Sequence, residues 1–124
     1  MIIRNMLSDH GWDYNMAFTE GGTEGLITGV IETIIVNAPP AGTRRMIKTI
    51  NIYTVEIALL SVIVKNGIVD SVIWSGWLDP GDTWVFGSIG EIIVLDSINK
   101  YVIAKLDAPP VIQPTFKTSY GDAS

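Results

Sequence analysis

From Leu26 onward, short apolar runs alternate with residues that favour turns. Ile and Val supply 30 of the 124 residues, and β-branched side chains suit the pleated surface of a sheet. No helical period is sustained along the chain. The pattern predicts seven or eight short strands in an all-β antiparallel sandwich or jelly roll. The predicted strands are residues 26–37, 44–55, 57–65, 68–78, 83–87, 91–95 and 100–106.

The first predicted strand, residues 26–37, is apolar on both faces. Its alternation places Val30, Ile34 and Val36 on one face and Ile31, Thr33 and Ile35 on the other. A strand with two apolar faces is typical of a central strand or of a subunit contact.

Four groups of turn residues divide the remaining strands. Pro39, Pro40 and Gly42 end the first strand, because proline lacks the N–H that a ladder needs. Asn66-Gly67 predicts a hairpin between 57–65 and 68–78, and Asp79-Pro80-Gly81-Asp82 predicts a β-turn. Residues 96–99 predict a last hairpin, which pairs 91–95 with 100–106. Pro109, Pro110 and Pro114 predict that residues 111–120 form an edge strand or an extended tail.

Residues 1–25 differ in pattern from the rest of the chain. They contain His10 and several aromatic residues, followed by a polar turn or linker at 20–25. We expect an extended N-terminal arm at 1–25, ordered by contact with a neighbour, before a β-sandwich domain at 26–124. An irregular segment packed on its own domain is the alternative.

Composition narrows the classes of partner. The formal net charge is -5, which argues against binding nucleic acid through a basic surface. Charged residues are only 17% and hydrophobic residues 48% of the chain, so we expect part of the surface to be covered by another subunit. A lone domain with a rich core is the alternative. Neither a signal peptide at residues 1–10 nor a membrane-spanning run is found, which predicts a soluble protein made in a cytoplasm.

Little catalytic chemistry is available. The chain has no cysteine and a single histidine, His10, so it lacks disulfides, thiolate metal sites and the usual nucleophilic triad. Asp79 and Asp82 are interpreted as turn residues rather than calcium ligands, and His10 with Asp9 and Asp13 as surface residues rather than a metal site. We therefore expect no catalytic residue, no cofactor and no metal, and keep a small lyase or hydrolase only as a remote hypothesis.

Aromatic and basic residues are the candidates for contact with a partner. Trp74 and Trp77 are three residues apart on one predicted strand, so their side chains point to opposite faces and one can lie outside the core. Exposed tryptophan favours protein contacts, and it can also stack on a sugar ring. Arginine pairs well with partner carboxylates. The candidate contact residues are Trp12, Tyr14, Phe18, Arg44, Arg45, Trp77 and Trp84.

Residues 35–120 resemble the small β-sandwich virion proteins of tailed bacteriophages. The resemblance begins with a Pro-Ala-Gly turn that is followed by basic residues and a strand with alternating Ile. A hairpin comes next, followed by a Leu with a Pro-Gly-Asp turn and by a closing pair of strands. The segments that carry it are 38–52 (APPAGTRRMIKTINI), 62–67 (VIVKNG), 77–86 (WLDPGDTWVF), 91–95 (EIIVL) and 101–105 (YVIAK).

This resemblance implies a non-enzymatic structural role in a virion. The subunit would decorate or cement a capsid, or belong to the head or tail, and would bind a capsid or tail protein. Proteins of this type are commonly homo-oligomers, often trimers, which implies a homo-oligomer and by preference a trimer here. A carbohydrate- or receptor-binding module on the same sandwich is the alternative function.

Overall fold

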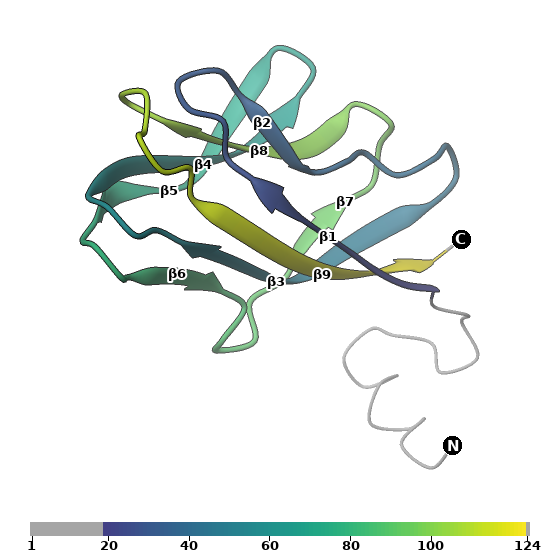
Figure 1. The fold of residues 1–124 in the computed structure, drawn as a ribbon. Helices are drawn as coiled ribbons and strands as arrows, with labels where there is room; N and C mark the ends of the chain where they lie inside the picture. Colours follow the sequence, from purple (N-terminus) through teal and green to yellow (C-terminus); the bar gives the residue numbers. More distant parts are fainter. Residues whose placement is uncertain (1–18, 124) are drawn as a thin grey trace.

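The computed structural model describes residues 19–123, which form nine strands and no helix (Figure 1). No helix of the described residues could therefore cross a membrane. The expectation of an all-β sandwich is confirmed, with one or two more strands than predicted. The strands are β1 Thr19–Leu26, β2 Thr33–Val36, β3 Arg44–Tyr53, β4 Ala58–Asn66, β5 Val69–Leu78, β6 Thr83–Phe86, β7 Ile93–Leu95, β8 Lys100–Leu106 and β9 Thr115–Ala123.

The strands form two antiparallel sheets that lie as two layers in Figure 1. Sheet A has the order β1-β9-β3-β6, and β7 also pairs with β3. Sheet B has the order β2-β8-β4-β5. Alternate side chains of both sheets meet between the layers and form one apolar core. Its buried members are Ile27, Ile35, Val36, Ile47, Ile50, Ile52, Ala58, Leu60, Val62, Leu78, Leu95, Val102, Ala104, Leu106 and Phe116.

Two predicted turns are present. β4 and β5 form the expected hairpin, and Asn66 pairs with Val69. The two-residue loop is therefore Gly67-Ile68, with the positive φ of 62° at Gly67 that a type II′ turn needs in its first position. In the next turn the N–H of Asp82 donates to the carbonyl oxygen of Asp79 at 3.0 Å. Gly81 there has a φ of 86°, as a type II turn with proline in second position requires.

Three sequence predictions about pairing were wrong. Residues 20–25 are not a turn or linker, because they belong to β1, which pairs with β9 along its whole length. The predicted strand 26–37 is divided: β1 ends at Leu26, and β2 covers only Thr33–Val36. Residues 91–95 and 100–106 do not form a hairpin, because β7 pairs with β3 in sheet A and β8 pairs with β2 and β4 in sheet B.

The last strand also differs from the expectation. β9 lies between β1 and β3 and is not an edge strand or a tail. The three prolines at 109, 110 and 114 precede its first residue, Thr115, so every residue of β9 keeps the N–H that an internal strand needs. Residues 19–25 belong to the sandwich through β1, and an extended arm stays a prediction for residues 1–18, which lie outside the described part of the chain.

Candidate assembly surface

The outer face of sheet B carries a row of apolar side chains across all four strands. Ile34 of β2 pairs with Ile103 of β8, Ile103 pairs with Ile63 of β4, and Ile63 pairs with Val72 of β5. Side chains at paired positions lie on the same face of a sheet. We call these four residues the sheet B row.

The row faces away from the core because its neighbours along each strand face into it. Leu60 and Val62 of β4 and Val102 and Ala104 of β8 belong to the core, so the alternating position 63 points outward, as does 103. Ile63 and Ile103 are nevertheless 6% and 0% exposed, so the middle of the row offers almost no surface to a partner. Ile34 and Val72 at the two ends are 52% and 61% exposed. The apolar surface of the row is thus at its two ends.

Polar side chains flank the row on one side. Lys65 of β4 pairs across the sheet with Tyr101 and Asp70. Its Nζ lies 3.0 Å from Asp70 Oδ1 and 3.1 Å from Glu32 Oε2. The hydrogen bond to Asp70 and then that to Glu32 raise the pKa of Lys65 above its ordinary value. Lys65 is therefore paired within its own chain, and this cluster of one lysine and two carboxylates keeps a formal charge of −1.

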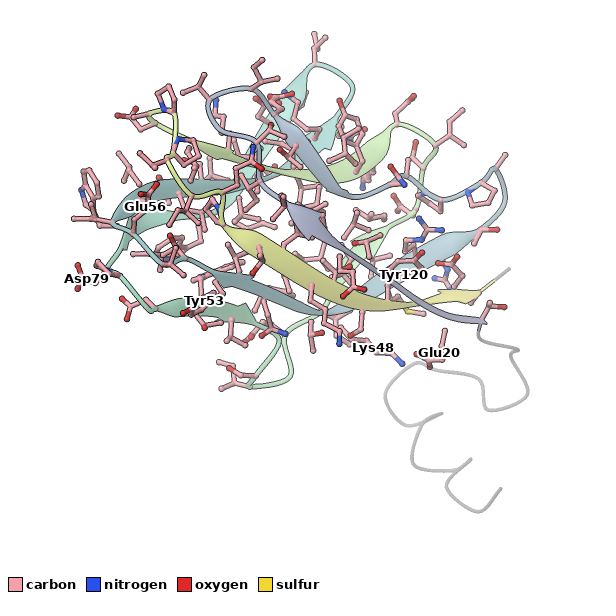
Figure 2. All side chains as sticks on the ribbon, in the orientation of Figure 1. Glu20, Lys48, Tyr53, Glu56, Asp79 and Tyr120 are labelled. Carbon is pink, nitrogen blue, oxygen red and sulfur yellow. The ribbon has the colours of Figure 1, made fainter. Side chains whose placement is uncertain are left out.

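The outer face of sheet A carries several charged and polar side chains. Glu24 of β1 pairs with Lys117 of β9, which pairs with Asn51 of β3. At the same surface, the Nζ of Lys48 lies 2.8 Å from a carboxylate oxygen of Glu20, and Figure 2 shows the two side chains pointing toward each other. Apolar side chains are also exposed on this face, since Leu26, Tyr53, Val85 and Val94 are 51%, 41%, 43% and 41% exposed. The two outer faces therefore differ in their charged pairs rather than in having or lacking apolar side chains.

A shallow groove lies at the end of sheet B where β4 begins and β8 ends. One part, of about 90 Å³, is lined by Trp77, Glu56 and Asp107 among others. The adjoining part, of about 160 Å³, includes Ser61 and Lys105. Trp77 is 63% exposed, and the carboxylate residues Glu56 and Asp107 line the same part of the groove.

The structure places Trp77 and Trp74 on opposite faces of sheet B. Trp77 points outward on sheet B, whereas Trp74 packs against the core, as their spacing predicted. Trp84 of β6 stacks on Trp74 with ring centroids 5.6 Å apart, and Phe86 lies 6.4 Å from Trp84. This stack joins sheet B to sheet A within the chain, so Trp84 is partly buried and contributes to the packing between the sheets.

The two arginines also differ. Arg44 is exposed at the first position of β3. Arg45 is buried, and its Nε and Nη2 donate to the two carboxylate oxygens of Asp122 at 2.8 and 2.9 Å. Its Nη1 donates to the carbonyl oxygen of Asn37 at 2.7 Å. The hydrogen bond to Asp122 is the main cause that raises the pKa of Arg45. The guanidinium of Arg45 is therefore engaged inside its own chain.

The other candidates carry no catalytic arrangement. Among residues 19–123, no three His, Cys, Asp or Glu side chains lie together as metal ligands would. The carboxylate of Asp82 accepts the N–H of Asp79 at 3.0 Å, in agreement with the interpretation as turn residues. Trp12, Tyr14 and Phe18, like His10, lie outside the described residues, and their contact role stays a prediction.

Comparison with known proteins gives little to add to this geometry. The sequence matches no protein-family model and no curated protein. Among solved structures, the chain is similar to one described as "Cyanophage Pam1 capsid asymmetric unit", with 10% sequence identity and a TM-score of 0.43. The alignment covers 88% of this chain and 84% of that chain. A score this low does not show a shared function.

Proposed function

We propose that this protein is a non-enzymatic structural subunit of a virion, made in the cytoplasm of the host cell. In this proposal it self-associates, and it binds a capsid or tail protein through the outer face of sheet B. The sheet B row is the observation that carries the proposal, because its two ends, Ile34 and Val72, are 52% and 61% exposed and Trp77 on the same face is 63% exposed. The resemblance of residues 35–120 to virion proteins of tailed phages supports the proposal that this virion is that of a tailed phage.

The dimensions of this face suit a protein contact. The four strands of sheet B hold 4, 7, 9 and 10 residues. With strands about 4.8 Å apart and a rise of about 3.4 Å per residue, the face measures roughly 500 Å². A standard protein interface buries roughly 800 Å² on each partner. The face and its surrounding loops together are thus large enough for a specific contact.

The virion role is tested on particles from the host that carries the gene. An antibody raised against the purified chain is applied to virions banded by density and to the soluble fraction of the same lysate. We expect the chain to band with the major capsid protein at a fixed ratio, and immunogold to label the particles. A chain found wholly in the soluble fraction would overturn the proposal.

Two variants expressed during infection test the surface itself. Val72→Glu places a charge in the sheet B row, and Val85→Glu places the same charge on β6 of sheet A, where Val85 is 43% exposed. We expect Val72→Glu to be lost from the virion band and Val85→Glu to remain. Equal retention of both variants would contradict a contact through sheet B.

The alternative function is a carbohydrate- or receptor-binding module, and the groove beside Trp77 favours it. An exposed indole next to the Glu56 and Asp107 carboxylates combines a flat apolar surface with hydrogen-bond acceptors. Titration against a panel of soluble glycans, followed by tryptophan fluorescence, tests this function. Saturable quenching that Trp77→Ala abolishes would favour it, and unchanged fluorescence across the panel would eliminate it.

A further inference from the structure

Strand β5 is a long edge of sheet B. It has ten residues and, among the described strands, pairs only with β4. The other edges are shorter: β1 has eight residues, β2 and β6 have four each, and β7 has three. An edge strand presents a row of N–H and C=O groups that another strand can pair with.

The hairpin shows which backbone groups of β5 face outward. Asn66 and Val69 close a two-residue loop, and such a closing pair exchanges its hydrogen bonds within the hairpin. Hydrogen-bonded and non-hydrogen-bonded pairs then alternate along the ladder. Before the bulge at Ile73 the outward groups belong to Asp70 and Val72, and after it to Ser75 and Trp77. These four residues also direct their side chains to the outer face of sheet B.

β5 carries few of the devices that keep natural edges apart. Its sequence contains no proline, lysine or arginine. Its one charged residue, Asp70, is bound to Lys65 of the same chain at 3.0 Å. Val72 and Trp77 are 61% and 63% exposed. The bulge at Ile73 divides the strand into two stretches, and either stretch can form a ladder.

We propose that β5 pairs in antiparallel fashion with β5 of a second copy of this chain. A two-fold axis perpendicular to the sheet would join the two four-stranded sheets into one of eight strands. This arrangement keeps both outer faces on the same side, so the two sheet B rows form one surface. Asp70 is the only charge on the strand. When the pairing is centred on Val72 or on Ser75, the two Asp70 carboxylates do not lie opposite each other.

The second copy is favoured by this self-complementarity, because an edge whose single charge is paired within its own chain, and whose outer side chains include Val72 and Trp77, matches itself. The inference rests on the self-association in the proposed function and does not depend on the virion role. Because a two-fold contact closes at two copies, it predicts a dimer or an even multiple. A trimer, which the phage resemblance implies, cannot be closed through this edge alone.

Single cysteines in the full chain test the pairing, since the natural sequence contains none. Val72→Cys and Ser75→Cys are oxidised alone and as an equimolar mixture, and Val85→Cys on the edge of sheet A is the matched control. Paired residues of antiparallel strands have Cα atoms about 4.5 to 5.5 Å apart, within the range of a disulfide. Non-reducing gels follow the linked dimer, and light scattering gives the molar mass of the unmodified protein.

We expect a β5 variant, or the mixture, to cross-link on the order of a hundredfold faster than Val85→Cys, as a millimolar effective concentration at about 10 μM protein would give. Light scattering should give an even multiple of the 13.5 kDa chain. A monomer, a mass of three chains, or cross-linking no faster than the control would each overturn the pairing. None of these outcomes bears on whether the chain bands with virions.

Discussion

Removing the carboxylate of Asp122 would leave a buried guanidinium without its counter-charge. Arg45 donates two hydrogen bonds to that carboxylate, at 2.8 and 2.9 Å. Its guanidinium carbon also lies 4.2 Å from the centre of the Tyr120 ring. Asp122→Ala keeps the arginine, the ring and the hydrogen bond to the carbonyl of Asn37, so the substitution isolates the ion pair.

The size of the effect follows from the burial of the pair. Breaking a buried ion pair by removing one partner costs about 3 to 5 kcal/mol, because the remaining charge stays away from water. The side chains of Arg45 and Asp122 are 10% and 20% exposed, so water reaches the carboxylate side and the lower end applies. We expect Asp122→Ala to lower the free energy of unfolding by about 3 kcal/mol. For a chain of this length that corresponds to a fall of about 12 °C in Tm.

Urea denaturation followed by tryptophan fluorescence measures this loss, at one fixed protein concentration because self-association contributes to stability. Glu20→Ala is the matched control, because it breaks the ion pair with Lys48 at the surface. The side chains of Lys48 and Glu20 are 48% and 68% exposed. The control should cost less than about 0.5 kcal/mol. If Asp122→Ala costs no more than the control, the desolvation argument fails. If it leaves stability unchanged and abolishes self-association, Arg45 acts at a subunit contact instead.

Three further predictions concern stability and titration. Trp84→Ala should lower the free energy of unfolding by about 2 kcal/mol through loss of its stack, and Trp77→Ala by less than about 0.5 kcal/mol; urea denaturation compares them. Gly67→Ala should cost about 1 kcal/mol in thermal unfolding, because Gly67 has a φ of 62°. The hydrogen bond from Lys100 lowers the pKa of Asp96, so this pair stabilises the fold at neutral pH and its contribution disappears as the pH falls through the lowered pKa. An NMR titration should show that Lys100→Met raises the Asp96 pKa, and an unchanged pKa would contradict the pairing.

Strand positions and tight turns could be predicted from the sequence because their causes are local. The hairpin between β4 and β5 follows from glycine between two apolar runs. The turn at 79–82 follows from proline in its second position and glycine in its third. Even here the centre of the hairpin loop is Gly67-Ile68 rather than Asn66-Gly67, because only one loop residue adopts a positive φ.

Strand partners could not be predicted, because they depend on where distant segments pack. β7 and β8 are separated by a short turn that suits a hairpin, yet they belong to different sheets. Proximity in sequence favours a hairpin. Each strand instead joins a different sheet and buries its inward side chains in the core between the two sheets, and this burial outweighs the local preference. The same holds for β9, which fills the place between β1 and β3, although the prolines before it suggested an edge.

The candidate surface was only partly visible in the sequence. The spacing of Trp74 and Trp77 correctly predicted that one points inward and one outward. The sheet B row was missed, because its four residues lie on four strands and only the register brings them together. Arg45 follows Arg44 directly and looked equally exposed, but its partner Asp122 lies 77 positions later.

The low charge of the chain is explained by where its apolar side chains lie. A core alone requires one apolar face on each sheet. Ile63 and Ile103 are buried but lie on the outer face of sheet B, so they add nothing to the packing between the sheets. Their neighbours Ile34 and Val72 leave the row open at both ends, one of them on the edge strand β5. An apolar row that the core does not use and that ends at an unpaired edge is accounted for most simply by contact with another protein.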